Sequence, residues 1–236
     1  MPADIRLGIV TGLVFEAAIL ANAARRAEVE DLWIVPAGLG AGRATAAAER
    51  LIAAGATHLM SFGIAAGLDP VLRSGTAVVA RAVQGSRGAP VTCDTSWADR
   101  LLAGLPGAVP GVVADCPEVL ETGAAKAALR SLTAASIGDM ESYDVATAAA
   151  QAQVPCAIVR VVGDRANQAI PSVALTGADD EGRIRKAVVV GAALRTPAQW
   201  GGLIRLALAT SAAKSRLKIL ADLGLPRLFF AELGDE

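Results

Sequence analysis

Short apolar runs alternate with longer, alanine-rich stretches along the chain. The runs predict strands at residues 5–11, 32–37, 58–62, 76–81, 135–138 and 155–162. The alanine-rich stretches have helical periodicity and predict helices at residues 16–27, 43–54, 124–132, 142–153, 183–194 and 203–223. This alternation is typical of a layered α/β fold with a largely parallel sheet. Residues 84–117 mix Gly, Pro and short apolar pieces, which predicts loops and irregular strands.

The domain organisation follows from length and composition. The 236 residues contain no Pro/Ser-rich or charge-dense linker, so we expect one domain over residues 1–236. Hydrophobic residues make up 53% of the chain but aromatic residues only 3%. Because binding of single-stranded nucleic acid relies on aromatic side chains on which bases stack, this composition argues against a nucleic-acid partner of that kind, and we expect none.

Localisation and cofactor chemistry are constrained by what the sequence offers. No apolar run reaches the roughly 18–20 residues that span a bilayer, and the N-terminus lacks a signal-peptide pattern, so we expect a cytoplasmic protein. Cys93, Cys116 and Cys156 have no CxxC spacing, and His58 is the only histidine. This residue set argues against a disulfide framework, a zinc site and a multi-histidine metal site, and we expect no cofactor. His58 lies in an apolar run, which favours a buried, hydrogen-bonded histidine over a catalytic one.

Polar residues that directly follow predicted strands are the candidates for chemistry, because ligands of open α/β sheets bind outside the carboxyl ends of the strands. Asp164 follows the apolar run 156–162, which also carries Arg160. Burial raises and a nearby cation lowers the pKa of such a carboxyl group, so Asp164 is either an acid catalyst or a cap of the next turn. Glu16 follows the first predicted strand in the same way.

Two further segments offer binding groups. Asp139 begins a predicted helix, which favours a capping role, whereas Glu141 could accept two hydroxyl hydrogen bonds from a ribose. The glycine-rich loop expected at residues 63–67 would let a ligand approach backbone N–H groups. The glycines at residues 38–42 fit a dinucleotide loop poorly and predict a tight strand-to-helix turn.

Four segments, taken in order, resemble motifs of the nucleoside phosphorylase and nucleosidase superfamily, which includes the bacterial methylthioadenosine/S-adenosylhomocysteine nucleosidases. They are Gly8-Ile9-Val10 with Glu16, the loop Ser61-Phe62-Gly63-Ile64-Ala65-Ala66-Gly67-Leu68, Asp139-Met140-Glu141-Ser142, and Arg160-Val161-Val162-Gly163-Asp164. The resemblance implies a three-layer α/β/α fold with a central mixed, largely parallel twisted sheet. It also implies a homo-oligomer, with a dimer expected, and cleavage of a purine N-glycosidic bond.

The resemblance also implies roles for individual residues. Asp164 would protonate or hydrogen-bond the purine N7, and Glu16 would orient or deprotonate the attacking water. Glu141 would hold the ribose hydroxyls, with Met140 packed against the sugar. Asp139 and the loop residues would complete the substrate site, and Arg160 would support it; the loop residues are Gly63, Ile64, Ala65 and Ala66.

Three departures from the family pattern change the expected pocket. Gly163 stands where the family has a serine, which removes a hydrogen bond that would support Asp164. Residues 122–126 lack the aromatic side chain that stacks on the base in relatives. Ile64 replaces a serine of the glycine-rich loop. The missing aromatic implies a different base pose or a looser pocket, and Ile64 removes the family's basis for inferring nucleophile binding at this loop.

The nucleophile is either water or inorganic phosphate as a co-substrate. The first loop, residues 11–16, offers no arginine, and Glu16 would repel phosphate, so hydrolysis is favoured. Arg43 follows a glycine-rich turn and could bind phosphate, although an exposed arginine at a helix start is the commoner case. The alternatives are a phosphate-dependent purine nucleoside phosphorylase and a 5′-methylthioadenosine/S-adenosylhomocysteine nucleosidase. The rival of another class is a non-catalytic nucleoside-binding protein.

The C-terminal helical segment at about residues 182–223 is strongly basic. Residues 182–221 contain eight basic residues and no acidic one. The short chain and its terminal helices resemble the hopanoid-associated phosphorylase group, which implies adenosylhopane, a lipid-linked adenine nucleoside, as a substrate. The basic segment then fits peripheral contact with an anionic membrane. The alternative is an ordinary amphipathic helix packed on the sheet.

Overall fold

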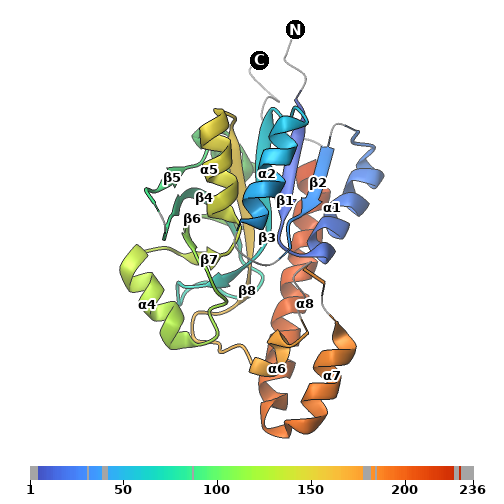
Figure 1. Cartoon of the computed structure of the whole chain (residues 1–236), viewed down its shortest axis with the longest axis vertical. Coiled ribbons are helices and arrows are strands. Elements are labelled where there is room, and N and C mark those ends of the chain that lie inside the picture. Colours follow the sequence, from blue (N-terminus) through green and yellow to red (C-terminus); the bar gives the residue numbers. More distant parts are fainter. Residues whose placement is uncertain are drawn as a thin grey trace.

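The computed structural model describes residues 5–30, 32–38, 42–86, 88–177, 182–183, 185–225 and 229. The strands are β1 (Leu7–Thr11), β2 (Leu32–Pro36), β3 (His58–Gly67), β4 (Ala77–Gln84), β5 (Val91–Thr92), β6 (Ala108–Asp115), β7 (Ile137–Asp139) and β8 (Cys156–Asp164). The α-helices are α1 (Val14–Ala27), α2 (Arg43–Ala53), α3 (Thr95–Gly104), α4 (Gly123–Thr133), α5 (Ser142–Ala152), α6 (Ser172–Leu175), α7 (Lys186–Arg195) and α8 (Trp200–Leu223). Figure 1 shows them as a helix-covered sheet from which one helical hairpin projects.

The strands form one mixed sheet that closes on itself. Strands β2, β1, β3 and β8 run parallel to their neighbours in that order. Strand β8 then pairs antiparallel with β4, β4 pairs parallel with β6, and β6 pairs parallel with β7. Because β7 returns to pair antiparallel with the end of β3, five strands complete a ring. The carboxyl ends of β1, β3, β7 and β8 meet beside this closure.

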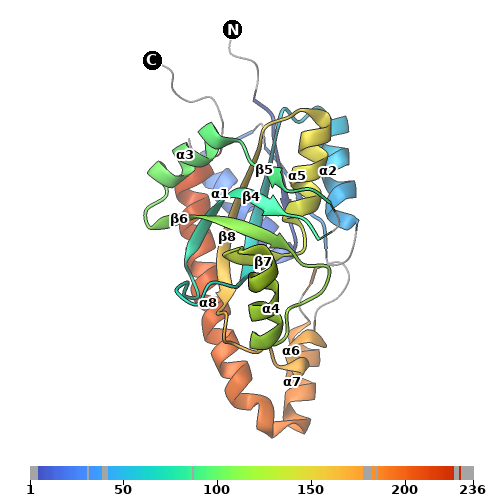
Figure 2. The same ribbon diagram turned by 90° about the vertical axis from the view of Figure 1, so that its left-hand side faces the viewer.

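Side-chain alternation along the strands builds a core on each face of the sheet. In β8, Val159 and Val161 pack with α1, α3 and α8, whereas Ile158 and Val162 pack with α2 and α5. Figure 2 shows α3 and α8 on one side of the strands and α2 and α5 on the other. The expected three-layer α/β/α architecture, with a sheet of mainly parallel strands, is confirmed.

Helix α8 is packed against the rest of the molecule along only half of its length. The second half of α8 is buried against the sheet through Ala213, Leu217 and Leu220. Its first half leaves the body and, together with α7, forms a projecting hairpin (Figure 1). We call residues 186–212 the arm. None of the helices in the described residues is both long enough and apolar enough to span a membrane.

Two stretches differ from the sequence prediction. Residues 63–67, expected as a glycine-rich loop, continue β3 because β8 pairs with them on one side and β7 pairs with their end on the other. Residues 84–117, expected as loops and irregular strands, contain the regular elements α3 and β6. Helix α3 forms because Asp94 caps its N-terminus, accepting the Trp97 N–H at 2.7 Å, and because Trp97 and Leu101 enter the core.

Candidate active site

A cavity of about 170 Å³ lies where the carboxyl ends of β1, β3, β7 and β8 meet. Five carboxylic acids line it, whereas no Lys, Arg or His is among the described residues on its wall. The remaining wall is mostly apolar and contains no aromatic ring within the described residues. The acidic residues are Glu16, Glu118, Asp139, Glu141 and Asp164, and the larger apolar ones are Leu13, Ile64, Val119, Leu120, Met140 and Ile170.

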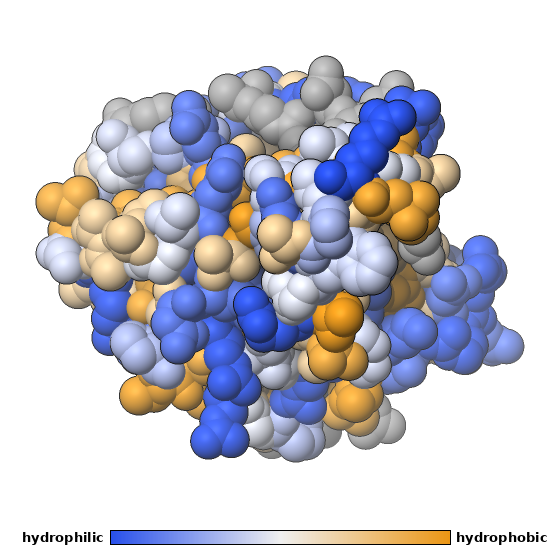
Figure 3. Space-filling view, turned by 90° about the horizontal axis from the view of Figure 1, so that it is seen from below, coloured by the Kyte–Doolittle hydropathy of each residue, from blue (hydrophilic) through white to orange (hydrophobic). Residues whose placement is uncertain are grey.

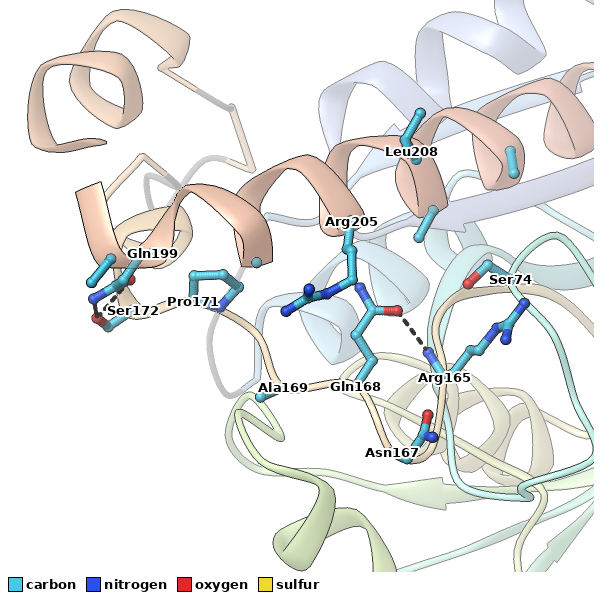
Figure 4. Close-up of a pocket in the computed structure, with 14 residues that line it drawn as sticks. Ser74, Arg165, Asn167, Gln168, Ala169, Pro171, Ser172, Gln199, Arg205 and Leu208 are labelled. Atoms are coloured by element: carbon cyan, nitrogen blue, oxygen red, sulfur yellow. Dashed lines mark hydrogen bonds between the residues drawn. The ribbon is translucent and has the colours of Figure 1, made fainter. Parts of the chain in front are cut away.

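A larger hollow, about 900 Å³, lies between the first half of α8 and the segment after β8. Figure 4 shows Arg205 extending from α8 toward this segment, which carries Arg165 and Gln168. The groove contains no carboxylic acid among its described lining residues. Because an acid–base reaction needs such groups, we place the candidate chemistry in the smaller cavity. Residues 165–171 contribute to both walls, since Ile170 lines the cavity and Arg165 the groove.

Arg160 organises one side of the cavity. It lies on the same face of β8 as Ile158 and Val162, so its side chain points toward the start of α5. Its Nε contacts Asp139 Oδ2 at 2.7 Å and its Nη2 contacts Glu141 Oε2 at 3.3 Å. Nη2 also donates to Ser61 Oγ at 2.7 Å. Among the described residues, Nη1 has no hydrogen-bond partner, so this buried donor is left for a ligand or water.

Asp139 and Glu141 use their carboxylates differently. Asp139 Oδ1 accepts the backbone N–H groups of Glu141 and Ser142 at 3.0 and 2.8 Å, and Ser142 Oγ donates to Oδ2 at 2.5 Å. Both carboxylate oxygens of Asp139 are therefore occupied, because they cap the start of α5 and hold Arg160. Glu141 keeps acceptor capacity and lies against Gly12, where a Cβ atom would come within 2.6 Å of Glu141 Oε1.

Glu16 connects the first turn of α1 to β3. Its Oε2 accepts the Leu13 N–H at 2.9 Å and its Oε1 accepts the Ile64 N–H at 2.8 Å. A side chain at position 63 would crowd this contact, because an added Cβ would lie 2.6 Å from Arg160 Nη1 and 2.7 Å from Glu16 Oε1. Gly63 thus lets a carboxylate and a guanidinium approach the same strand.

The electrostatics of this cluster follow from one buried cation facing three buried acids. Burial raises the pKa of Glu16, while Arg160 and backbone hydrogen bonds oppose the rise. Burial also raises the pKa of Glu141, and the charges of Asp139 and Glu16 add to it against the opposing effect of Arg160. Burial raises the pKa of the Cys116 thiol as well, with nearby carboxylates adding to the effect. Cys116 is therefore a neutral wall residue and not a thiolate nucleophile.

Asp164 lies on the opposite side of the cavity from Arg160 and is paired with a different cation, Lys126. The ammonium of Lys126 is ion-paired with Asp164 Oδ2, and both side chains are largely or fully buried. Burial raises the pKa of Asp164, and the charge and hydrogen bond of Lys126 oppose that rise. Lys126 is therefore the side chain that supports the Asp164 carboxylate, while a Cβ on Gly163 would face Ile64 and Ala65 of β3.

The structure brings most of the predicted site residues together. Glu16, Ile64, Ala65, Ala66, Asp139, Met140, Glu141 and Asp164 all line the cavity, and Arg160 and Gly63 lie directly behind it. Arg43 is exposed at the start of α2 and is not among the lining residues. His58 is buried at the far end of β3, where its Nδ1 lies 3.0 Å from Thr57 Oγ1.

Sequence reasoning missed Lys126. Its one available signal was that it is the only charged residue between Gly123 and Leu129, in a stretch otherwise rich in alanine. It also missed the apolar wall formed by Val119, Leu120 and Ile170, because these residues come from irregular segments with no helical or strand period.

Solved structures of several nucleosidases resemble this fold. The 5′-methylthioadenosine/S-adenosylhomocysteine nucleosidase from Colwellia psychrerythraea 34H, in complex with adenine, aligns with a TM-score of 0.69 at 17% identity, covering 97% of each chain. The Campylobacter jejuni nucleosidase of the same name gives 0.64 at 18% identity, covering 93% of this chain and 100% of that one. Futalosine hydrolase from Helicobacter pylori gives 0.66 at 16% identity, covering 92% and 97%.

At the level of sequence, no curated protein matches the chain. A family profile described as the phosphorylase superfamily matches residues 24–195. This range contains Glu141, Arg160 and Asp164, and it begins after Glu16. The expectation of an enzyme of the nucleosidase or nucleoside phosphorylase class agrees with the match. The chain belongs to the phosphorylase superfamily.

Proposed function

We propose that the protein cleaves the N-glycosidic bond of an adenine nucleoside by hydrolysis and releases adenine. The observation that carries the proposal is the cavity wall, which has five carboxylic acids and no basic side chain among its described residues. Glycoside cleavage passes through a cationic, oxocarbenium-like sugar. Carboxylic acids that outnumber the adjacent cations Arg160 and Lys126 stabilise that sugar cation more than the neutral nucleoside, which lowers the barrier.

The reaction assigns a role to each polar group. The C1′–N9 bond breaks and its electron pair moves to the purine, whose N7 takes a proton from Asp164. Water attacks C1′ and loses a proton to Glu16, so the sugar gains a hydroxyl and adenine leaves as a neutral base. Glu141 accepts hydrogen bonds from the ribose hydroxyls, with Met140 against the sugar. Exchange of protons with solvent then restores Asp164 and Glu16.

The acidic wall of the cavity also favours water over phosphate as the nucleophile. A phosphate anion would enter a cavity whose acids repel it, and Arg43 lies at an exposed helix start outside the lining residues. The unpartnered Nη1 of Arg160 and the carboxylate of Glu16 both lie over Gly63. A donor beside an acceptor suits a water molecule, which can accept from one group and donate to the other.

The substrate carries a 5′-substituent in this proposal. Methylthioadenosine, S-adenosylhomocysteine and futalosine are candidates because they appear in the names of the similar structures. Adenosylhopane is a further candidate through the resemblance to the hopanoid-associated group. In place of an aromatic stacking partner, the base would lie between aliphatic side chains such as Leu120 and Ile170.

Release of adenine from adenosine, methylthioadenosine and a lipid-linked adenine nucleoside tests the proposal, with and without phosphate. We expect adenine from at least one of the three at a rate independent of phosphate. Formation of ribose 1-phosphate would instead establish a nucleoside phosphorylase. Binding of all three nucleosides without any release would establish a non-catalytic nucleoside-binding protein.

The arm supports a further part of the proposal, peripheral contact with an anionic membrane. Twelve large apolar side chains are exposed in the described part of the chain, and half of them lie on the arm, at Val188, Val190, Leu194, Trp200, Ile204 and Leu208. Arg195 and Arg205 are exposed beside them. Figure 3, seen from below, shows hydrophobic patches separated by hydrophilic ones on this end of the molecule. Exposed apolar groups next to cations fit an anionic lipid surface.

Sedimentation with vesicles tests this contact. We expect the wild type to bind phosphatidylserine-containing vesicles and not purely zwitterionic ones, and I204E/L208E to lose binding. Ile219→Glu is the matched control, because Ile219 is also exposed on α8 but lies beyond the arm. Equal sedimentation with both lipids would contradict the proposal. A dimer in solution that I204E/L208E dissociates would assign the same face to a second copy of the chain.

A further inference from the structure

Lys126 is the single buried residue of α4. The other described side chains of this helix are exposed or partly exposed, and Leu129 is the partly buried one that packs against the small cluster around Leu68 and Ala114. The fully buried ammonium of Lys126 reaches the carboxyl end of β8. Burying a lysine is costly unless its charge is paired and its three N–H donors are satisfied.

All three donors of Lys126 have acceptors. One is Asp164 Oδ2, and the others are the carbonyl oxygens of Arg165 at 2.9 Å and Gln168 at 2.8 Å. The ammonium therefore holds the Asp164 carboxylate and the turn that follows it in one arrangement. That turn begins the wall that separates the cavity from the larger groove.

We infer that Lys126 is a positioning residue for proton transfer by Asp164: its ammonium holds Oδ2 and so leaves Oδ1 to face the purine. This inference rests on the proposed function. When the proton passes from Asp164 to the departing base, the carboxylate that remains is paired with a cation already in place. Lys126 thus makes Asp164 a stronger acid at the moment of transfer and fixes the direction of its proton.

Other ionisable groups share the cavity with Asp164. They are Glu16 from α1, Cys116 and Glu118 after β6, and Asp139 and Glu141 before α5. The side chain of Arg165 lines the groove instead. Within the described residues, Lys126 is the group that forms an ion pair with Asp164. Removing the cation therefore leaves burial, which favours the protonated form of Asp164, opposed only by a backbone hydrogen bond among the causes that set its pKa.

The test compares Lys126→Met with Arg130→Met. Arg130 is the matched control, since it anchors the same helix one turn later through Asp69 at 2.8 Å and does not contact Asp164. As a general acid, Asp164 acts while protonated, so activity falls above its pKa. We expect K126M to move this alkaline limb of kcat upward by about one pH unit or more and to lower kcat about tenfold or more. R130M keeps the wild-type profile.

A second measurement does not depend on activity or on the folding of K126M. The chain has four lysines, Lys126, Lys186, Lys214 and Lys218, so ¹⁵N-labelled lysine gives few ammonium signals in NMR spectra. The slowly exchanging signal of buried Lys126 should shift strongly in Asp164→Asn and stay in place in Arg130→Met. This measurement tests the Lys126–Asp164 ion pair independently of the proposed function, because the expected shift of the signal does not require that any nucleoside be cleaved.

Two results would overturn the inference. One is a pH profile and kcat for folded K126M that match those of R130M, which would leave Lys126 as an anchor of α4 only. The other is a Lys126 ammonium signal that Asp164→Asn does not change.

Discussion

Two buried charge centres face each other across the cavity, and they are built in opposite ways. Around Arg160, one cation is shared by Asp139, Glu141 and Glu16, so acids are in excess. At the other centre, Lys126 and Asp164 form a pair of one cation and one acid. An excess of negative charge suits binding and stabilising a cationic sugar, whereas a balanced pair suits an acid that must give up a proton and remain as an anion.

The two cations, Arg160 and Lys126, also come from different kinds of element. Arg160 lies within β8, whose residues are all buried, so its cluster belongs to the core of the sheet. Lys126 reaches in from a helix that is otherwise on the surface. Both centres should contribute to folding, because breaking a buried ion pair is costly, and the Lys126 centre should in addition control proton transfer by Asp164. Unfolding measurements test the contribution to folding, and kinetic measurements test the contribution to the reaction.

The largest effect is expected from Arg160→Gln. It leaves three buried acids without their cation, and breaking a buried pair typically costs about 3–5 kcal/mol. Urea unfolding would measure the loss, and activity should fall with it. Arg81→Gln is the control, because the Arg81–Asp99 pair is exposed and should contribute under about 1 kcal/mol. Equal losses in the two variants would contradict the distinction between a buried cluster and a surface pair.

Asp164→Asn should remove proton donation to the base, and it also leaves the buried Lys126 ammonium without its ion-pair partner. An amide cannot supply the proton, so kcat should fall about 10²–10⁴-fold while KM changes little. Steady-state kinetics with ultraviolet detection of adenine would measure both constants. The assignment of the acid fails if kcat stays within a few-fold of the wild type.

Glu141→Gln should weaken substrate binding. A hydrogen bond to a charged group is worth about 1.5–3 kcal/mol, so kcat/KM should fall about 10- to 100-fold. Because burial and neighbouring acids raise the pKa of Glu141, its carboxylate forms only at higher pH than usual. Wild-type KM should therefore decrease as pH rises through that pKa, and the variant should lose this dependence. A 2′-deoxynucleoside should lose less in the variant than the ribonucleoside does.

Gly63→Ala should have the smallest effect of the four. The new methyl group would meet Arg160 Nη1 and Glu16 Oε1, and overpacking of this kind costs about 1–3 kcal/mol. Gly191→Ala is the matched control, since its Cβ would meet nothing within 4 Å and alanine is the better helix former. Thermal unfolding should show a lower Tm for the first variant and an unchanged or higher Tm for the second.

A site residue can be predicted from the sequence when the pattern of its neighbours along the chain already indicates where it lies. Asp164 and Glu141 follow apolar runs, so their position at the sheet edge could be inferred from period and polarity alone. Residues 63–67 could not be identified as strand, because glycine and alanine have low strand propensity and the pairing that holds them comes from β7 and β8.

Long-range contacts explain the other differences. Helix α3 is short and lies among Gly and Pro residues, and it is stabilised by burying Trp97 and Leu101 in a core made by distant segments. Lys126 lies 38 positions before Asp164, and an exposed-looking lysine in an alanine-rich helix gives no local sign of a buried partner.

Hydrolysis of methylthioadenosine in H₂¹⁸O, with and without phosphate, tests the central claim most directly. If Asp164 protonates the base in a cavity that excludes anions, the released sugar carries one ¹⁸O atom, the rate is the same in both solutions, and Asp164→Asn abolishes the product. A sugar 1-phosphate formed only when phosphate is present, or adenine release that Asp164→Asn leaves intact, would contradict the account.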